Sequence, residues 1–166
     1  MRLIACAVVV LTLSAVGAAQ LNGGYTIDAA GSGARNFTSF GAAVVALGAG
    51  INGPVVLTVA SATFRETVSL TPVSGTSPTN TITFTTTSVP AVLDANGGQD
   101  AVKLADGCAH FIFDNIRIVN FTRYGVWLDG QSTSPAGVTR CTFQNLEVIA
   151  AGTSTRPVYL TYSDSN

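Results

Sequence analysis

Three residues that could bind a sugar, Lys103, Trp127 and Tyr159, each occupy the centre of an apolar triplet. The triplets are Val102–Leu104, Val126–Leu128 and Val158–Leu160. Because side chains alternate between the two faces of a strand, each central residue points outward when its neighbours point inward. Stacked strands would therefore align one cation and two aromatic rings on a surface. This strip is either a sugar-binding face, a stabilising cross-strand ladder, or aromatic cover beneath residues 131–138.

Carboxylates at turns are the second candidate for chemistry. Asp94, Asp106 and Asp129 each lie where a short apolar run ends. Paired carboxylates can hydrolyse a glycosidic bond, and their oxygens can bind Ca²⁺. The alternative is turn formation, which Asp favours beside Gly or Ala. If a catalytic site exists in the chain, Asp106, Asp129 and Arg123 are its candidates; no metal or other cofactor is predicted, since no acidic cluster supports a calcium site.

Other reactive side chains are few. His110 is the single histidine, and no G-x-S-x-G motif occurs, so neither a metal site nor a catalytic triad is predicted. Cys108 and Cys141 could form a disulfide in a secreted chain, or remain buried thiols. Arg117 and Glu147 recur at equivalent positions, which predicts an ion pair on the outer surface.

A repeated pattern carries these residues. Phe111–Phe113, Asn115 and Ile116–Ile118 recur as Cys141–Phe143, Asn145 and Leu146–Val148. One copy cannot bury its own apolar positions, whereas stacked copies can. We therefore predict an all-β solenoid in which each copy is one turn and successive turns pair in parallel. The residues expected to face the core are Val102, Leu104, Phe111, Phe113, Ile116 and Ile118.

The stretch 101–120, AVKLADGCAHFIFDNIRIVN, resembles the parallel β-helix repeat of the pectin-lyase-like superfamily. The resemblance implies a right-handed parallel β-helix with three sheets per turn. Members include enzymes that act on acidic polysaccharides and surface or adhesive proteins without known catalysis. It also implies a ladder of inward asparagines at a bend, at Asn115 and Asn145. A bend residue in the left-handed conformation is the alternative explanation for these two asparagines.

One helix is predicted before the first strands, over residues 40–47. Its apolar face would carry Phe40, Val44 and Leu47, its N-cap would be Thr38 or Ser39, and Gly48 or Gly50 would end it. The terminal turn of a solenoid needs cover, so this helix is interpreted as a cap on the core. We expect the coil itself to begin near Phe84, one turn before Phe113.

The N-terminal half is also similar to the opening of pectin methylesterases. The similar segments are Asp28–Gly33, Asn36–Ala43, Pro54–Val59 and Thr63–Glu66. These correspond to a glycine turn, an F-x-S/T-I/F-x-x-A helix, a strand and a G-T-Y-x-E turn. Ala62 stands where the family has Gly, and the later esterase motifs are not found, so no catalytic role is transferred.

Residues 1–19 read as a signal peptide, because Arg2 precedes an apolar run too short to span a membrane. Residues 20–166 are predicted to form the N-terminal cap and first turns of the β-helix, with no membrane span after signal removal. The sequence ends just after Val158–Leu160, so we expect a C-terminally incomplete solenoid, covered by further turns or by another chain.

Composition narrows the function. Charged residues make up 10% of the chain and the formal net charge is −1, so no basic surface for nucleic acid is expected. The sequence favours a secreted or cell-surface structural, adhesive or polysaccharide-binding protein. The alternative is the N-terminal portion of a polysaccharide-degrading lyase, esterase or hydrolase whose catalytic turns lie beyond residue 166.

Overall fold

The computed structural model describes residues 19–130, 137–150, 152 and 155–161. The predicted signal peptide lies outside them, except for Ala19. The elements are β1 (Leu21–Ile27), β2 (Asn36–Phe37), α1 (Phe40–Leu47), β3 (Ile51–Val59), β4 (Thr63–Arg65), β5 (Val68–Leu70), β6 (Ile82–Thr85), β7 (Ala91–Asp94), β8 (Asp100–Ala105), β9 (Phe111–Asp114), β10 (Ile116–Val119), β11 (Tyr124–Asp129), β12 (Thr142–Gln144), β13 (Glu147–Val148) and β14 (Arg156–Thr161).

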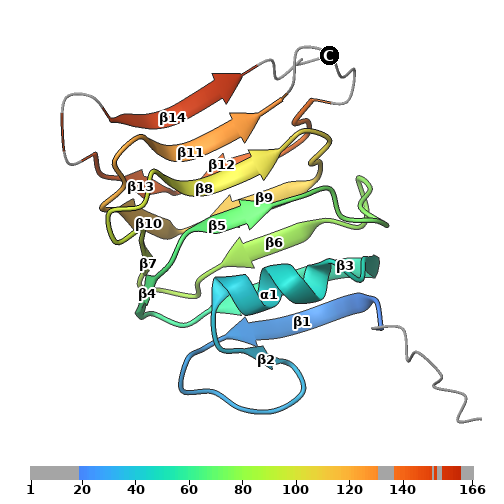
Figure 1. Cartoon of the computed structure of the whole chain (residues 1–166). Helices are drawn as coiled ribbons and strands as arrows, with labels where there is room; N and C mark the ends of the chain where they lie inside the picture. Colours follow the sequence, from blue (N-terminus) through green and yellow to red (C-terminus); the bar gives the residue numbers. More distant parts are fainter. Residues whose placement is uncertain (1–18, 131–136, 151, 153–154, 162–166) are drawn as a thin grey trace, which may run out of the picture.

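The strands form three sheets that wind into one coil (Figure 1). We call them sheet A (β12-β9-β6-β3-β1-β2), sheet B (β13-β10-β7-β4) and sheet C (β14-β11-β8-β5). From β3 onward the chain visits sheets A, B and C in turn, and the strand pairings described are parallel. The predicted fold is confirmed: the protein is an all-β parallel solenoid of about five turns with one short helix.

The repeat alignment predicted the register of the later turns correctly. Phe113 pairs with Phe84 on one side and with Phe143 on the other. Their rings stack through the core, with centroids 4.9 Å apart for Phe84–Phe113 and 5.4 Å apart for Phe113–Phe143. The residues predicted to face inward are all buried. A continuous aromatic column thus runs along the solenoid axis.

The expectation that the coil begins near Phe84 is wrong. Strand β3 pairs in parallel with β6, aligning Leu57 with Phe84, and β1 pairs in parallel with β3. Two further turns therefore precede Phe84. The aromatic repeat does not mark them, because the inward residue of β3 in this column is Leu57 rather than Phe.

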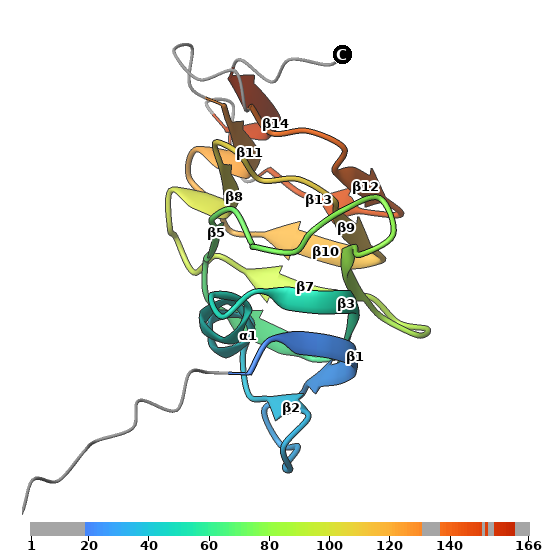
Figure 2. The same cartoon turned by 90° about the vertical axis from the view of Figure 1, so that its right-hand side faces the viewer.

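Helix α1 lies beside β5, at the edge of sheet C, where it also contacts β1 and β2 (Figure 2). Ser39 is its N-cap and accepts a hydrogen bond from the Ala42 N–H at 3.0 Å. Phe40, Ala43 and Leu47 are its buried residues, so Ala43 occupies the central inward position predicted for Val44, which is half-buried. The helix thus covers one end of the core, as the amphipathic pattern predicted.

The opposite end differs from the rest of the coil. Val158 and Leu160 of β14 are 53% and 57% exposed, although Val126 and Leu128, their partners on β11, are 1% and 8% exposed. Apolar side chains that are core residues one turn earlier are therefore open on the last described turn.

Candidate functional site

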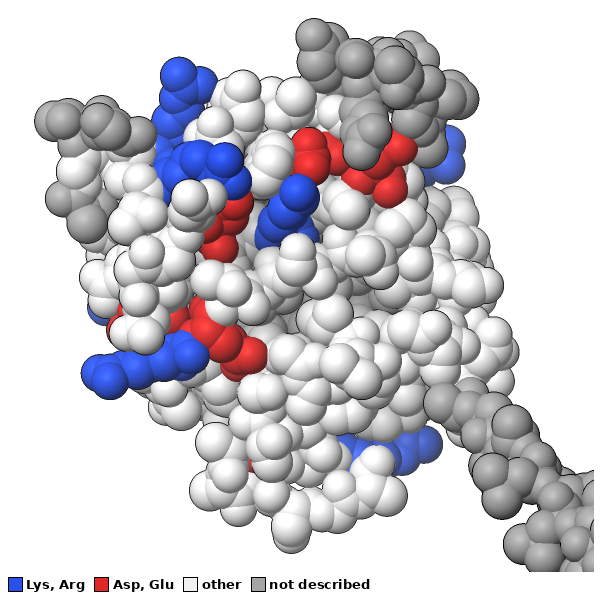
Figure 3. Space-filling model, viewed as in Figure 1, with Lys and Arg blue, Asp and Glu red and all other residues white. Residues whose placement is uncertain are grey.

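Charged side chains gather over the outer face of sheet C, in the upper half of the view in Figure 3. Aromatic side chains lie on the same strands. Strand register arranges them as three rows of three. The rows are Asp100, Lys103 and Ala105 on β8; Tyr124, Trp127 and Asp129 on β11; and Arg156, Tyr159 and Thr161 on β14. We call these nine positions, together with Arg123, the sheet C face.

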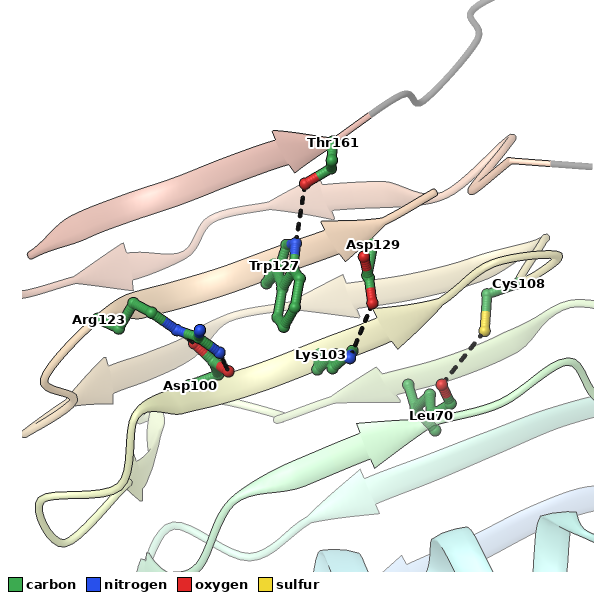
Figure 4. Close-up of polar contacts among 8 residues, drawn as sticks. All are labelled: Leu70, Asp100, Lys103, Cys108, Arg123, Trp127, Asp129 and Thr161. Carbon is green, nitrogen blue, oxygen red and sulfur yellow. Dashed lines mark hydrogen bonds and ion pairs between the residues drawn. The ribbon is translucent and has the colours of Figure 1, made fainter. Parts of the chain in front are cut away.

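Lys103, Trp127 and Tyr159 occupy one column of this face, as their triplets predicted. Lys103 Nζ lies 4.0 Å from the centroid of the Trp127 ring, which is a cation–π distance. The Trp127 Nε1–H donates a hydrogen bond to Thr161 Oγ1 at 3.0 Å (Figure 4). The indole is half-buried and held at both ends, so its orientation is fixed before any ligand binds.

Tyr124 adds a third ring to the strip. Tyr124 stacks on Tyr159 with centroids 4.3 Å apart and an interplanar angle of 12°. Tyr124 also contacts Trp127, with the ring planes tilted at 58° and centroids 5.6 Å apart. The three rings thus form one contiguous, half-buried aromatic cluster on the parallel strands β11 and β14.

Cations border the rings. The Arg123 guanidinium lies 4.9 Å from the Tyr124 centroid and 4.8 Å from the Trp127 centroid. The Arg156 guanidinium lies 5.1 Å from the Tyr159 centroid. Planar guanidinium groups stack on aromatic faces and bind oxyanions through paired N–H donors. The edge of the cluster is therefore equipped for polar recognition.

Two ion pairs fix part of this charge. Lys103 Nζ lies 2.8 Å from Asp129 Oδ2, and Arg123 forms a two-pronged pair with Asp100, with Nε 2.8 Å from Oδ1 (Figure 4). The hydrogen bonds that Arg123 donates to the Asp100 carboxylate raise the pKa of Arg123 above its ordinary value. Among the described residues Arg156 has no ion-pair partner, so the sheet C face has one positive charge in excess.

The acidic candidates are only partly brought together. Asp129 lies beside Ala105 across the strand pair, and Asp106 follows Ala105 in the turn after β8. Arg123, in contrast, precedes β11, which Asp129 ends, so their backbones are about 20 Å apart along the strand. Both Asp129 and Arg123 are engaged in ion pairs. These ion pairs hold the Lys103 and Arg123 cations beside the aromatic rings.

Asn115 and Asn145 lie at the predicted bend between sheets A and B, with φ of 57° and 53°. The Asn115 amide donates to Thr86 Oγ1 at 2.6 Å, and the Asn145 amide donates to Asp114 Oδ1 at 2.7 Å. Asn145 is exposed. The left-handed backbone accounts for asparagine at both positions. The hydrogen bonds found for the two amides lead to the preceding turn, and that of Asn115 also reaches the Ser88 carbonyl at 3.3 Å.

Cys108 and Cys141 are free thiols in the structure. Cys108 is buried and its thiol points to the Leu70 carbonyl at 3.5 Å, while Cys141 is half-buried and directly precedes β12 in the last described turn. Burial raises the pKa of both thiols, that of Cys108 to about 12. His110 is buried with a φ of 63° and its carbonyl accepts from the Ile82 N–H, which is a backbone role.

Arg117 and Glu147 pair on the outer face of sheet B, with Nε 2.6 Å from Oε2, as their alignment predicted. Both side chains are close to half exposed. An exposed pair of this kind contributes little stability, and nothing else of the candidate site lies on that sheet.

Sequence reasoning missed Tyr124, Arg156, Asp100 and Thr161. The signal was present in the register, since Tyr124 follows the same spacing from Trp127 that Arg156 has from Tyr159. The apolar triplets obscured it, because strands β8 and β11 break their alternation at Ala101 and Gly125, both buried. That break turns the residue three positions before the central one outward as well.

Comparisons of the chain with protein-family models, with curated proteins and with solved structures gave no match. In the described part of the chain, no three His, Cys, Asp or Glu side chains are grouped closely enough to hold a metal ion. Within the same residues, no helix has the length and apolar character needed to cross a membrane.

Proposed function

We propose that the protein is a secreted or cell-surface β-solenoid, of the pectin-lyase-like kind, that binds polysaccharide through the sheet C face. The observation that carries this proposal is the contiguous cluster of Tyr124, Trp127 and Tyr159 on one flat outer face. Aromatic rings offer apolar area to the C–H faces of sugars, and adjacent polar groups fix the orientation of the ligand.

Pre-organisation favours binding over a purely structural ladder. The ring of Trp127 is positioned by Lys103 and by its hydrogen bond to Thr161, so little side-chain entropy remains to be lost on binding. The excess positive charge at Arg156 favours a chain that carries carboxylates, since a guanidinium binds carboxylates through paired hydrogen bonds. Parallel strands also present equivalent positions turn after turn, which matches the repeated units of a polymer.

The experiment is affinity electrophoresis of the purified protein through gels that contain acidic or neutral plant and microbial polysaccharides. The double variant Trp127→Ala/Tyr159→Ala should be retarded less than the wild type. Its apparent affinity should be lower by at least about tenfold, as expected for removal of central aromatic contacts. The control is Arg117→Ala/Glu147→Ala on sheet B, which removes two side chains of the outer surface without touching the rings.

Thermal melts of each variant separate lost binding from lost folding. If the double variant is retarded as strongly as the wild type, the assignment of binding to the sheet C face is overturned. No retardation by any polymer would overturn polysaccharide binding itself. New reducing ends or unsaturated products in the same incubations would instead favour the enzyme alternative.

A further inference from the structure

A second surface site lies at the other end of the molecule, where the loop between β1 and β2 extends from the solenoid (Figure 2). The loop, β1 and β3 line a surface pocket of about 710 Å³ that is open to solvent. Pockets of roughly 300–1,000 Å³ are the usual size for small ligands. Sheet C contributes no residue to its lining, so this pocket is separate from the proposed polysaccharide face.

Arg35 is the single charged residue in the lining of this pocket. One of its terminal nitrogens, Nη1, donates to the carbonyls of Asn22 and Gly24, each at 3.0 Å. The guanidinium also lies 5.0 Å from the centroid of the Tyr25 ring, which itself stacks on Phe37 at 5.5 Å. The guanidinium is therefore held by neutral groups, and no carboxylate among the described residues pairs with it.

The Arg35 guanidinium still has hydrogen-bond donors that a ligand can use. A guanidinium has five N–H donors, and the contacts with Asn22 and Gly24 use those of Nη1. The Nε and Nη2 donors form the edge that binds an oxyanion in two parallel hydrogen bonds. The hydroxyls of Ser32 and Thr58 line the same pocket, and neither is engaged in a hydrogen bond within the described part of the chain. One cationic, two hydroxyl-bearing and one aromatic residue thus line the same space.

Gly24 keeps the pocket open. A Cβ built at Gly24 meets no atom within 4 Å, and the residue has ordinary strand geometry rather than a positive φ. Glycine costs stability inside a strand relative to residues with side chains. Its presence here is not required by backbone conformation or by close packing, and a larger side chain at this lining position would take up open space of the pocket.

We propose that this pocket binds a small hydroxylated molecule that carries an oxyanion, either a carboxylate or a phosphate. The Arg35 guanidinium pairs with the oxyanion, Ser32 and Thr58 exchange hydrogen bonds with ligand hydroxyls, and the open surface above Gly24 admits the body of the molecule. This inference does not depend on the polysaccharide proposal, because the two sites share no residue.

The test is titration of the ¹⁵N-labelled protein, followed by NMR, with glucuronate, glucose 6-phosphate, inorganic phosphate and glucose. We expect saturable shifts of the Gly24, Ser32 and Thr58 amides with glucuronate or glucose 6-phosphate, and none with glucose at the same concentration. The response to glucuronate against glucose 6-phosphate distinguishes a carboxylate ligand from a phosphate ligand.

Three variants complete the test. Arg35→Lys keeps the charge but removes the two-pronged edge and should weaken binding by about tenfold or more. Gly24→Val fills the pocket with a strand-compatible side chain and should abolish the shifts while the melting temperature is retained. Thr83→Val, on the same face of sheet A but outside the pocket, should leave them unchanged.

Equal binding of glucose and glucuronate would overturn the oxyanion assignment. Binding of inorganic phosphate as tight as that of glucose 6-phosphate would overturn the claim that the ligand is hydroxylated. Absence of shifts with every probe at millimolar concentration, or full binding by Gly24→Val, would overturn the site. Trp127→Ala/Tyr159→Ala should bind these probes like the wild type, which keeps this result separate from the fate of the sheet C face.

Discussion

The carboxylate of Glu66 accepts a hydrogen bond from the backbone N–H of Phe40 at 2.9 Å. Its second oxygen accepts from the Gly41 N–H at 2.8 Å. The residue that follows β4 thus closes the N-terminus of α1, where unpaired N–H groups and the helix dipole favour a negative charge. This contact holds the capping helix against the next turn of the coil. It also joins Asn36–Ala43 and Thr63–Glu66, two segments whose sequences resemble the opening of pectin methylesterases.

Removal of this contact should weaken the cap. Glu66→Ala leaves two helix N–H groups without their charged acceptor, so the free energy of unfolding should fall by about 1–3 kcal/mol. Urea unfolding followed by circular dichroism measures this. Arg65→Ala is the matched control, because the Arg65 side chain is 74% exposed and its 3.8 Å pair with Asp94 is long, so the pair contributes little. A loss at Glu66 no larger than that at Arg65 would contradict the capping role.

The aromatic column predicts a graded set of core losses. Phe113→Ala removes a ring that is 2% exposed and stacked on both sides, so unfolding free energy should fall by about 3–5 kcal/mol. Phe143→Ala removes a half-buried ring of the last described turn and should cost distinctly less. Chemical denaturation of both variants gives the comparison. Equal losses of unfolding free energy would contradict the role of the aromatic column in stabilising the core.

Sequence patterns predicted positions along the coil better than contacts across its surface. The alternation around Phe113, Ile118 and Trp127 fixes which residues face inward and which turns align, because burial imposes a period of two on a strand. The first two turns escaped prediction because Leu57 replaces the aromatic marker of the repeat. The pairing of Glu66 with Phe40 escaped because a hydrogen bond across 26 residues leaves no periodic trace.

The sheet C face shows the same contrast between positions that the sequence pattern predicts and contacts that only the structure reveals. The column of Lys103, Trp127 and Tyr159 followed from spacing alone, since each residue lies between two inward-facing neighbours. The stacking of Tyr124 on Tyr159 did not, because it depends on a break in alternation at Gly125, where a Cβ would lie 2.4 Å from Val148. Close packing of that kind is a three-dimensional constraint that the one-dimensional pattern does not contain.

Asp94 should make stability depend on acid pH. Hydrogen bonds from the Asn120 amide at 2.9 Å and the Asn96 N–H at 2.8 Å, with the nearby Arg65 charge, lower the pKa of Asp94 below its ordinary value of 3.8. A lowered folded pKa means that the ionised carboxylate stabilises the fold above pH 3.8, and that this stabilisation is lost as the pH falls through the folded value.

Urea midpoints of the wild type and Asp94→Asn between about pH 6 and pH 2 check this expectation. The variant should be less stable at neutral pH and should lose less on acidification. Asn120→Ala, which removes the largest cause of the lowered pKa, should show an intermediate slope. Parallel profiles of stability against pH for the wild type and Asp94→Asn would show that Asp94 is not the source of the acid sensitivity.

The thiols should be unreactive until the protein unfolds. Burial raises the pKa of Cys108 from 9.0 to about 12, which corresponds to about a thousandfold less thiolate at pH 8. Alkylation of Cys108 by iodoacetamide, resolved from Cys141 by peptide mass spectrometry, should be far slower in buffer than in urea. Because the unfolded thiol ionises near pH 9 and the folded thiol does not, stability should also fall as pH rises above about 9, and less steeply in Cys108→Ala.

The same labelling decides the question that the sequence left open. If both thiols react after unfolding without a reductant, they are free, as the structure has them. If neither reacts until a reductant is added, a disulfide joins adjacent turns, and Cys108 has moved away from the Leu70 carbonyl, which its thiol contacts at 3.5 Å. Fast alkylation of Cys108 in the folded protein would instead mean that the last described turn does not cover it.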